Sequence, residues 1–136
     1  MRIMAVDYGD VRTGLAVSDL SGTMTGQAWV VSERNPAKVA QIIADESAAR
    51  EVFKIILGYP KNMNGTIGPR AEKSEQLAET IRGICGVTVV LWDERMTTMS
   101  AHRILSDTGK HGKKRKQTVD AVAASLILES YLASLD

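Results

Sequence analysis

Residues 2–19 read RIMAVDYGDVRTGLAVSD, and this stretch decides how the rest of the chain is interpreted. Ile3 to Val6 is an almost continuous apolar run, typical of a strand that is buried on both faces. Asp7 to Asp10 follows with turn-forming residues, and Thr13 to Ser18 reads as a second strand. Because a parallel pair needs a crossover of about a dozen residues or more, these two strands are predicted to be antiparallel neighbours.

The segments downstream complete an α/β pattern. A third strand, another antiparallel neighbour, is predicted over Gly26 to Val31, and two more strands each follow a helix. Strands linked through helices are expected to be parallel, with right-handed crossovers. The sequence therefore predicts an α/β protein with a mixed five-stranded sheet, three antiparallel strands and then two parallel ones, flanked by helices. The later segments are helices from Asn35-Pro36 and from Pro69 to Gly86, strands Phe53 to Leu57 and Val87 to Trp92, and helices from about Thr98 to Ser106 and from Thr118 onward.

Composition agrees with a globular protein. The chain has 136 residues, of which 44% are hydrophobic and 24% charged, so we expect one domain over residues 1–136 with a genuine core. The single cysteine, Cys85, excludes an internal disulfide. No apolar run approaches the ~18 residues of a membrane span, and the short apolar N-terminus is unlike a signal peptide. A cytoplasmic protein with no membrane partner is expected.

Positive charge is concentrated in one short segment. The formal net charge is only +1, but five of the 17 basic residues fall between positions 110 and 116, and the remaining 12 face 16 acidic residues. Such an asymmetry suggests a polyanionic partner. A solvated flexible loop explains the segment equally well. The five residues are Lys110, Lys113, Lys114, Arg115 and Lys116.

Three carboxylates stand out by their positions. Asp7 ends the first strand, Glu94 follows the fifth, and Asp120 lies in the first turn of the last predicted helix. Ligand sites in α/β sheets form beyond the carboxyl ends of the parallel strands, where acids brought together would repel each other. A divalent cation such as Mg²⁺ removes that conflict, and two of them can promote phosphodiester cleavage.

Each acid also has an ordinary explanation. An aspartate at a strand end is common in turns, Glu94 can pair with Arg95, and Asp120 can be stabilised by the helix dipole. Asp120 begins an apolar stripe that continues at Ala124, Ile127 and Tyr131, and an unpaired charge on an inward face is costly. The prediction therefore depends on the three acids meeting, not on any one of them.

Four motifs together resemble one family, called YqgF or RuvX. Their order and spacing agree, and they span essentially the whole chain. They are Asp7 to Asp19, then Gly58-Tyr59-Pro60 with Met63-Asn64-Gly65, then Asp93 to Thr98, and finally Lys116 with Val119 to Ala124.

The resemblance implies a ribonuclease H-like fold, related to the RuvC Holliday-junction resolvases. It implies a catalytic, metal-binding triad of Asp7, Glu94 and Asp120 that uses Mg²⁺ or Mn²⁺. It also implies processing of the 5′ end of the 16S ribosomal RNA precursor. Because adjacent residues in a strand face opposite ways, only one of Asp93 and Glu94 can be the ligand. The family motif favours Glu94, and Asp93 is the fallback.

Substrate contacts are expected around these acids. Gly9 lies in the first hairpin with Arg12, where glycine permits a left-handed backbone and lets a phosphate approach closely. Gly65 lies in a loop that precedes a helix N-terminus, a natural phosphate site. The basic segment should bind phosphates without sequence preference. A structured RNA is the expected partner of a monomer or homodimer. A junction resolvase on branched DNA, which needs a symmetric dimer, and a non-catalytic nucleic-acid-binding module are the alternatives. The predicted substrate-binding residues are Gly9, Arg12, Gly65, Lys113, Lys114, Arg115 and Lys116.

Overall fold

A computed structural model describes residues 1–22, 24–62, 64–93 and 112–135, with the backbone alone described over 112–120. The predicted helix over 98–106 lies outside these residues. The described elements, in chain order, are β1 (Arg2–Asp7), β2 (Arg12–Ser18), β3 (Thr25–Ser32), α1 (Pro36–Ala49), β4 (Val52–Tyr59), α2 (Pro69–Ile84), β5 (Thr88–Asp93) and α4 (Gly112–Ala133).

The described strands form one mixed sheet, with β1 at its centre. Their order across the sheet is β3-β2-β1-β4-β5. β1, β2 and β3 pair antiparallel, whereas β4 pairs parallel to β1 and β5 parallel to β4. This confirms the predicted mixed sheet, and it brings the carboxyl ends of β1, β4 and β5 to one edge.

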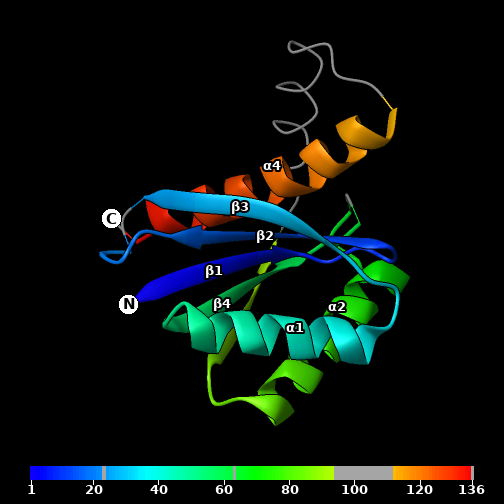
Figure 1. The fold of residues 1–136 in the computed structure, drawn as a ribbon. Helices are drawn as coiled ribbons and strands as arrows, with labels where there is room; N and C mark the ends of the chain where they lie inside the picture. Colours follow the sequence, from blue (N-terminus) through cyan, green and yellow to red (C-terminus); the bar gives the residue numbers. More distant parts are fainter. Residues whose placement is uncertain (23, 63, 94–111, 136) are drawn as a thin grey trace.

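Helices cover the sheet on both faces. Figure 1 shows α1 and α2 on one side and α4 on the other. Met4 and Val6 of β1 belong to the core cluster that contains residues of α1 and α2. Ile3 and Ala5, which alternate with them, belong to the cluster that contains residues of α4. Because successive residues of a strand point to opposite faces, the position of each strand residue tells which helical layer it faces.

Small side chains lie beneath α4. Ala5 of β1 and Ala16 of β2 are fully buried, as is Ala124 of α4. Side chains of this size let a helix come close to a sheet. Ile127 and Tyr131 are buried on the same helical stripe, so the predicted apolar face of the last helix is confirmed over the residues whose side chains are described.

Helix starts follow the predicted signals. The Asn35 side chain accepts a hydrogen bond from the backbone N–H of Ala37, and Pro36 begins α1. Asparagine is a favoured capping residue because its side chain satisfies an N–H group that the first turn leaves unpaired. Pro69 begins α2, as expected.

Two helix boundaries differ from the prediction. The chain becomes extended at Cys85, with φ −138° and ψ 163°, so Gly86 does not cap α2. α4 begins at Gly112 and not at Thr118, which places Lys113 to Lys116 on the helix and not in a loop. Lysine, arginine and glutamine are good helix formers, and nothing between residues 113 and 118 breaks a helix. Within the described ranges, no helix is long and apolar enough to span a membrane.

Candidate active site

Asp7 is the last residue of the central strand. Its position in the strand, next to Ala5 on one face and Val6 on the other, puts its side chain on the α4 face of the sheet. Its antiparallel partner on β2 is Gly14. A side chain directly opposite would lie about 4.5–5.5 Å away at Cβ. Glycine at position 14 therefore contributes no side chain opposite Asp7 on the α4 face.

Asp93 lies on the other face of the sheet. Trp92, just before it, belongs to the α4 side, where its indole N–H donates to Ser130 Oγ at 3.3 Å and its ring meets Tyr131 edge-on at 5.3 Å. Strand alternation then directs Asp93 toward the α1 and α2 layer. Glu94, the next residue, lies outside the described residues.

Asp120 lies on α4, four residues before the buried Ala124, and its side chain is outside the description. Near its C-terminal end, α4 is tied to the beginning of β4, because Lys54 Nζ donates to the Tyr131 hydroxyl at 2.9 Å. Lys54 pairs with Ile3 of β1. From residue 131 back to residue 120 the helix spans about 16 Å. From residue 3 to residue 7 β1 spans ~13 Å, so the backbone at position 120 comes nearly level with the end of β1. Figure 1 shows the N-terminal half of α4 on the side where β1 ends.

The metal site itself stays a prediction. Among the side chains that the structure describes, no three histidine, cysteine or acidic residues gather to hold a metal ion. Asp7 is the one member of the predicted triad whose side chain is described. Its carboxylate lies at the edge expected from the sequence.

The turn after Asp7 explains the glycine at position 9. A Cβ atom there would lie 2.2 Å from the carbonyl oxygen of Arg12, so any larger residue would collide with backbone. The left-handed glycines among the described residues are Gly22 and Gly65. The expected reason for glycine at position 9, backbone freedom, is therefore wrong, and the actual reason is space. Gly65 does need its freedom, with φ +86°, in a turn where its N–H donates to the Asn62 carbonyl at 2.8 Å.

The remaining predicted contacts fall in three places. Arg12 begins β2, two residues before Gly14, and alternation puts it on the α4 face with Asp7. Lys113 to Lys116 occupy the first turns of α4, where only the backbone is described. Gly65 lies in the connection between β4 and α2. Two of the three places, Arg12 and the start of α4, thus share a face of the sheet with Asp7.

Sequence inspection missed a cluster of charged residues beside this edge, which we call the Asp10 cluster: Asp10, Arg70 and Lys73. Lys73 Nζ lies 3.0 Å from Asp10 Oδ1, and Arg70 Nη1 lies 3.4 Å from Asp10 Oδ2. Arg70 also donates from Nη2 to the carbonyl oxygen of Tyr8 at 2.9 Å. The cluster joins the turn after Asp7 to the first turns of α2. Its signal in the sequence, two basic residues three apart after Pro69, is too ordinary to single out.

Two pKa values in this region are shifted. The hydrogen bond and the charge of Lys73 lower the pKa of the Asp10 carboxyl below its ordinary value. Burial, together with the nearby Asp10 charge, raises the pKa of the Tyr8 hydroxyl. Asp10 is therefore ionised and Tyr8 neutral near neutral pH.

The fold is that of the ribonuclease H-like proteins. The structure resembles the fowlpox virus resolvase in complex with Holliday junction DNA, with a TM-score of 0.62 and 15% identity, and the match covers 99% of each chain. It also resembles T. thermophilus RuvC in complex with a Holliday junction, with a TM-score of 0.58 and 16% identity over 99% of this chain and 96% of that one. The ribonuclease H-like fold expected from the sequence is confirmed.

Sequence comparison gives the family. The family described as "RuvX: Holliday junction resolvase" matches residues 1–134. A protein of Halothermothrix orenii, named "Putative pre-16S rRNA nuclease", is 42% identical over 97% of this chain and 94% of its own length. The chain belongs to the RuvX family, as the motifs indicated.

Proposed function

We propose that this protein is a metal-dependent nuclease that processes the 5′ end of the 16S ribosomal RNA precursor. The observation that carries the proposal is the place of Asp7, a carboxylate at the carboxyl end of the central strand with a glycine opposite it. Family membership and the nuclease name of a relative 42% identical support the same activity. The substrate is made in the bacterial cytoplasm, so this is also the proposed location.

We propose Glu94 and Asp120 as the partners of Asp7. Asp93 lies on the face away from α4, and a strand continuing by one residue would return position 94 to the face of Asp7. The path of α4 supports Asp120, because its N-terminal half extends toward the edge where β1 ends. Carboxylate oxygens are the ligands that Mg²⁺ and Mn²⁺ prefer, so the donor set fits either ion.

The chain's own residues then have distinct roles. When bound, a divalent ion supplies charge neutralisation and an activated water for phosphodiester hydrolysis. Asp7, Glu94 and Asp120 hold it, and Gly14 adds no side chain opposite Asp7. Arg12, on the same face, and the basic residues at the start of α4 hold the RNA backbone through its phosphates.

The decisive experiment compares single amide variants in cleavage of a 16S precursor RNA with Mn²⁺. Asp7→Asn and Glu94→Gln should each lower the cleavage rate by about a hundredfold or more, the loss typical of removing one electrostatic group from an active site. Asp93→Asn is the matched control, adjacent in sequence and on the opposite face, and should keep nearly full activity. If Asp93→Asn abolishes cleavage while Glu94→Gln does not, the assignment of the second ligand is wrong. If all three variants cleave like the parent protein, the nuclease proposal fails.

Resolution of Holliday junctions is the second candidate, favoured by the description of the matching family. Paired nicks in a four-way junction require a two-fold symmetric dimer. Analytical ultracentrifugation, combined with cleavage of a synthetic four-way junction, separates the candidates. A monomer that cuts precursor RNA and leaves the junction intact supports the first. A dimer that nicks opposing strands of the junction supports the second.

A further inference from the structure

We infer that Arg70 and Lys73 form a phosphate subsite for the substrate strand, and that the Asp10 carboxylate occupies this subsite in the free protein. The inference rests on the proposed function, since it concerns how the same active-site edge receives RNA. It adds a second contact surface, on α2, to the basic residues of α4.

The geometry of the Asp10 cluster is that of a bound anion. Lysine and arginine groups from two successive turns of α2 converge on one carboxylate, and each cation approaches a different oxygen, at 3.0 and 3.4 Å. A phosphate presents oxygens to the same donors, and arginine is well suited to either anion. Two donors that hold a carboxylate in this way can hold a backbone phosphate in its place.

The carboxylate is weakly held. The side chains of Asp10, Arg70 and Lys73 are 59%, 54% and 52% exposed. Ion pairs this exposed contribute little to stability, because water and salt screen them. An RNA strand that places a phosphate nearby would therefore displace Asp10 at little cost.

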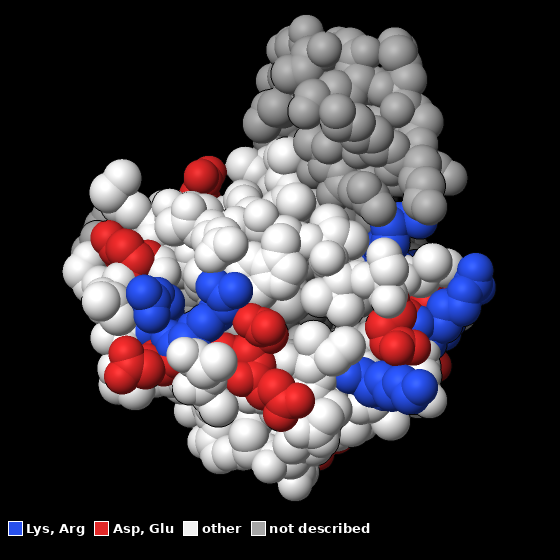
Figure 2. Space-filling model, viewed as in Figure 1, with Lys and Arg blue, Asp and Glu red and all other residues white. Residues whose placement is uncertain are grey.

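The surroundings have room for a strand. A surface pocket of about 490 Å³ adjoins the cluster, and its lining includes Asp10 and Lys73, a third cation, Arg34, and the donors Gln76 and Thr80. The turn that carries Asp10 begins directly after Asp7. Figure 2 shows basic and acidic side chains intermixed over the face it views. At the Asp10 cluster two cations share one carboxylate, which leaves a local excess of positive charge.

This arrangement predicts that removing the cations and removing the carboxylate of the Asp10 cluster change RNA affinity in opposite directions. Binding of a short fluorescent single-stranded RNA is measured by anisotropy in EDTA, where no cleavage occurs. Arg70→Gln and Lys73→Gln should each weaken binding and lower the salt dependence of log K by roughly 0.7, the value of one single-strand phosphate contact. Asp10→Asn should strengthen binding about two- to fivefold, the range that an exposed ion pair is worth.

The chain provides a matched control at the far end of α2. Arg82 likewise contacts a carboxylate, that of Glu79, and donates to a backbone carbonyl, that of Val89 at 2.7 Å. Glu79→Gln and Arg82→Gln should leave RNA affinity and its salt dependence unchanged. Lys73→Gln keeps the test valid if Arg70→Gln unfolds, because the hydrogen bond to the Tyr8 carbonyl comes from Arg70, whereas Lys73 contacts the Asp10 carboxylate.

The outcomes separate this inference from the nuclease proposal. If Asp10→Asn weakens binding as Arg70→Gln does, the cluster is only a structural clamp and the inference is wrong. If the Glu79 and Arg82 variants change RNA affinity as much as the Asp10 and Arg70 variants do, the effect is one of general surface charge and the inference is wrong. Unchanged affinity in every variant would also overturn it. Because the binding measurement needs no metal and no cleavage, it can be interpreted even if the nuclease proposal fails.

Discussion

At the scale of single residues, the turn after Asp7 depends on the absence of a side chain at Gly9. Gly9→Ala should destabilise the protein by about 1–3 kcal/mol, the usual effect of adding a methyl group where space is filled. The reason is the 2.2 Å approach of a Cβ atom to the Arg12 carbonyl oxygen. Denaturant unfolding measures the change.

Gly83 is the control for that substitution. It lies within α2, where a Cβ atom would meet nothing within 4 Å. Gly83→Ala should stabilise the protein by up to about 0.5–1 kcal/mol, because alanine loses less backbone freedom in a helix. A Gly9→Ala variant as stable as Gly83→Ala would mean that the turn is not as tight as described.

At the residue scale, the sequence predicts positions that follow directly from local apolar patterning. The place of Asp7 at the end of a buried strand could be predicted from the apolar run before it. The Asp10 cluster could not, because it joins residues 60 or more positions apart through α2. The role of Gly9 was misjudged because only coordinates show which backbone atom lies in the way.

At the scale of elements, the position of α4 depends on small buried side chains. Ala124→Leu should destabilise the protein by about 1–3 kcal/mol, because the helix rests on Ala5 and Ala16, both fully buried. It should also lower nuclease activity by moving the start of α4, which carries Asp120. Urea unfolding and RNA cleavage test both effects. Ala133→Leu, at an exposed position on the same helix, should change neither.

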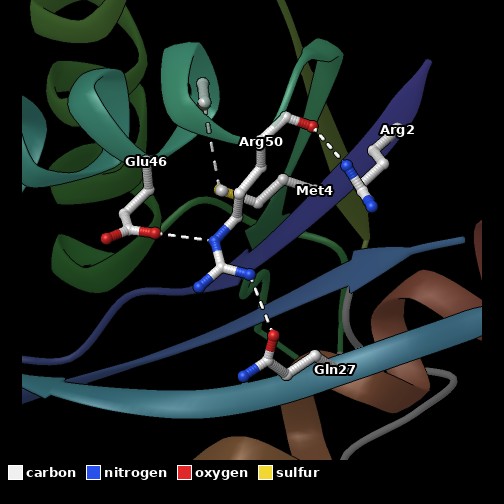
Figure 3. Close-up of polar contacts among 6 residues, drawn as sticks. Arg2, Met4, Gln27, Glu46 and Arg50 are labelled. Carbon is white, nitrogen blue, oxygen red and sulfur yellow. Dashed lines mark hydrogen bonds and ion pairs between the residues drawn. The ribbon is translucent and has the colours of Figure 1, made fainter. Parts of the chain in front are cut away.

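Arg50 ties α1 to the edge strand β3, at the end of the sheet away from Asp7. Figure 3 shows its guanidinium between Glu46, to which Nε lies at 2.7 Å, and Gln27 Oε1, which accepts from Nη1 at 2.9 Å. The same group lies 4.1 Å from the centre of the Trp29 ring. Arg2 donates to the Arg50 backbone carbonyl, a contact that does not need the Arg50 side chain.

Arg50→Ala should therefore lower the free energy of unfolding by about 1–2 kcal/mol, through loss of a charged hydrogen bond and a cation–π contact. RNA cleavage by the folded variant should be unchanged, because Arg50 neighbours the N-terminal end of β1. Thermal unfolding and a cleavage assay below the transition give the answer. Reduced cleavage at unchanged stability would mean that this network reaches the active-site edge.

Element-level prediction was accurate for strands and less so for helix ends. Apolar patterning and connection length sufficed for the positions and directions of the five strands, whereas their order across the sheet comes from the structure. The sequence predicts a start at Thr118, six residues after the observed start of α4 at Gly112, because the basic segment resembles a loop. A run of lysine and arginine is compatible with either, and helix propensity decides only when a packed helix follows.

At the scale of the whole molecule, the fold brings the carboxyl ends of β1, β4 and β5, which are far apart in the sequence, to one edge of the sheet. α4 packs on the face of β1 that carries Ala5 and Asp7, and our proposal places the Asp120 carboxylate beside Asp7 there. From the sequence, the strand-end positions of Asp7 and Glu94 suggest that the acids meet, and the resemblance to the family implies the full triad. The packing of Ala5 places Asp7 on the α4 face of the sheet, and the packing of Trp92 places Asp93 on the opposite face.

The central claim is that carboxylates from distant parts of the chain share a divalent ion on the α4 face of the sheet. Crystals soaked in Mn²⁺ test it most directly, because anomalous scattering locates the ion. We predict a peak within coordination distance of Asp7, with Glu94 and Asp120 completing the set. A peak on the opposite face beside Asp93, or none near Asp7 at saturating Mn²⁺, would contradict the account.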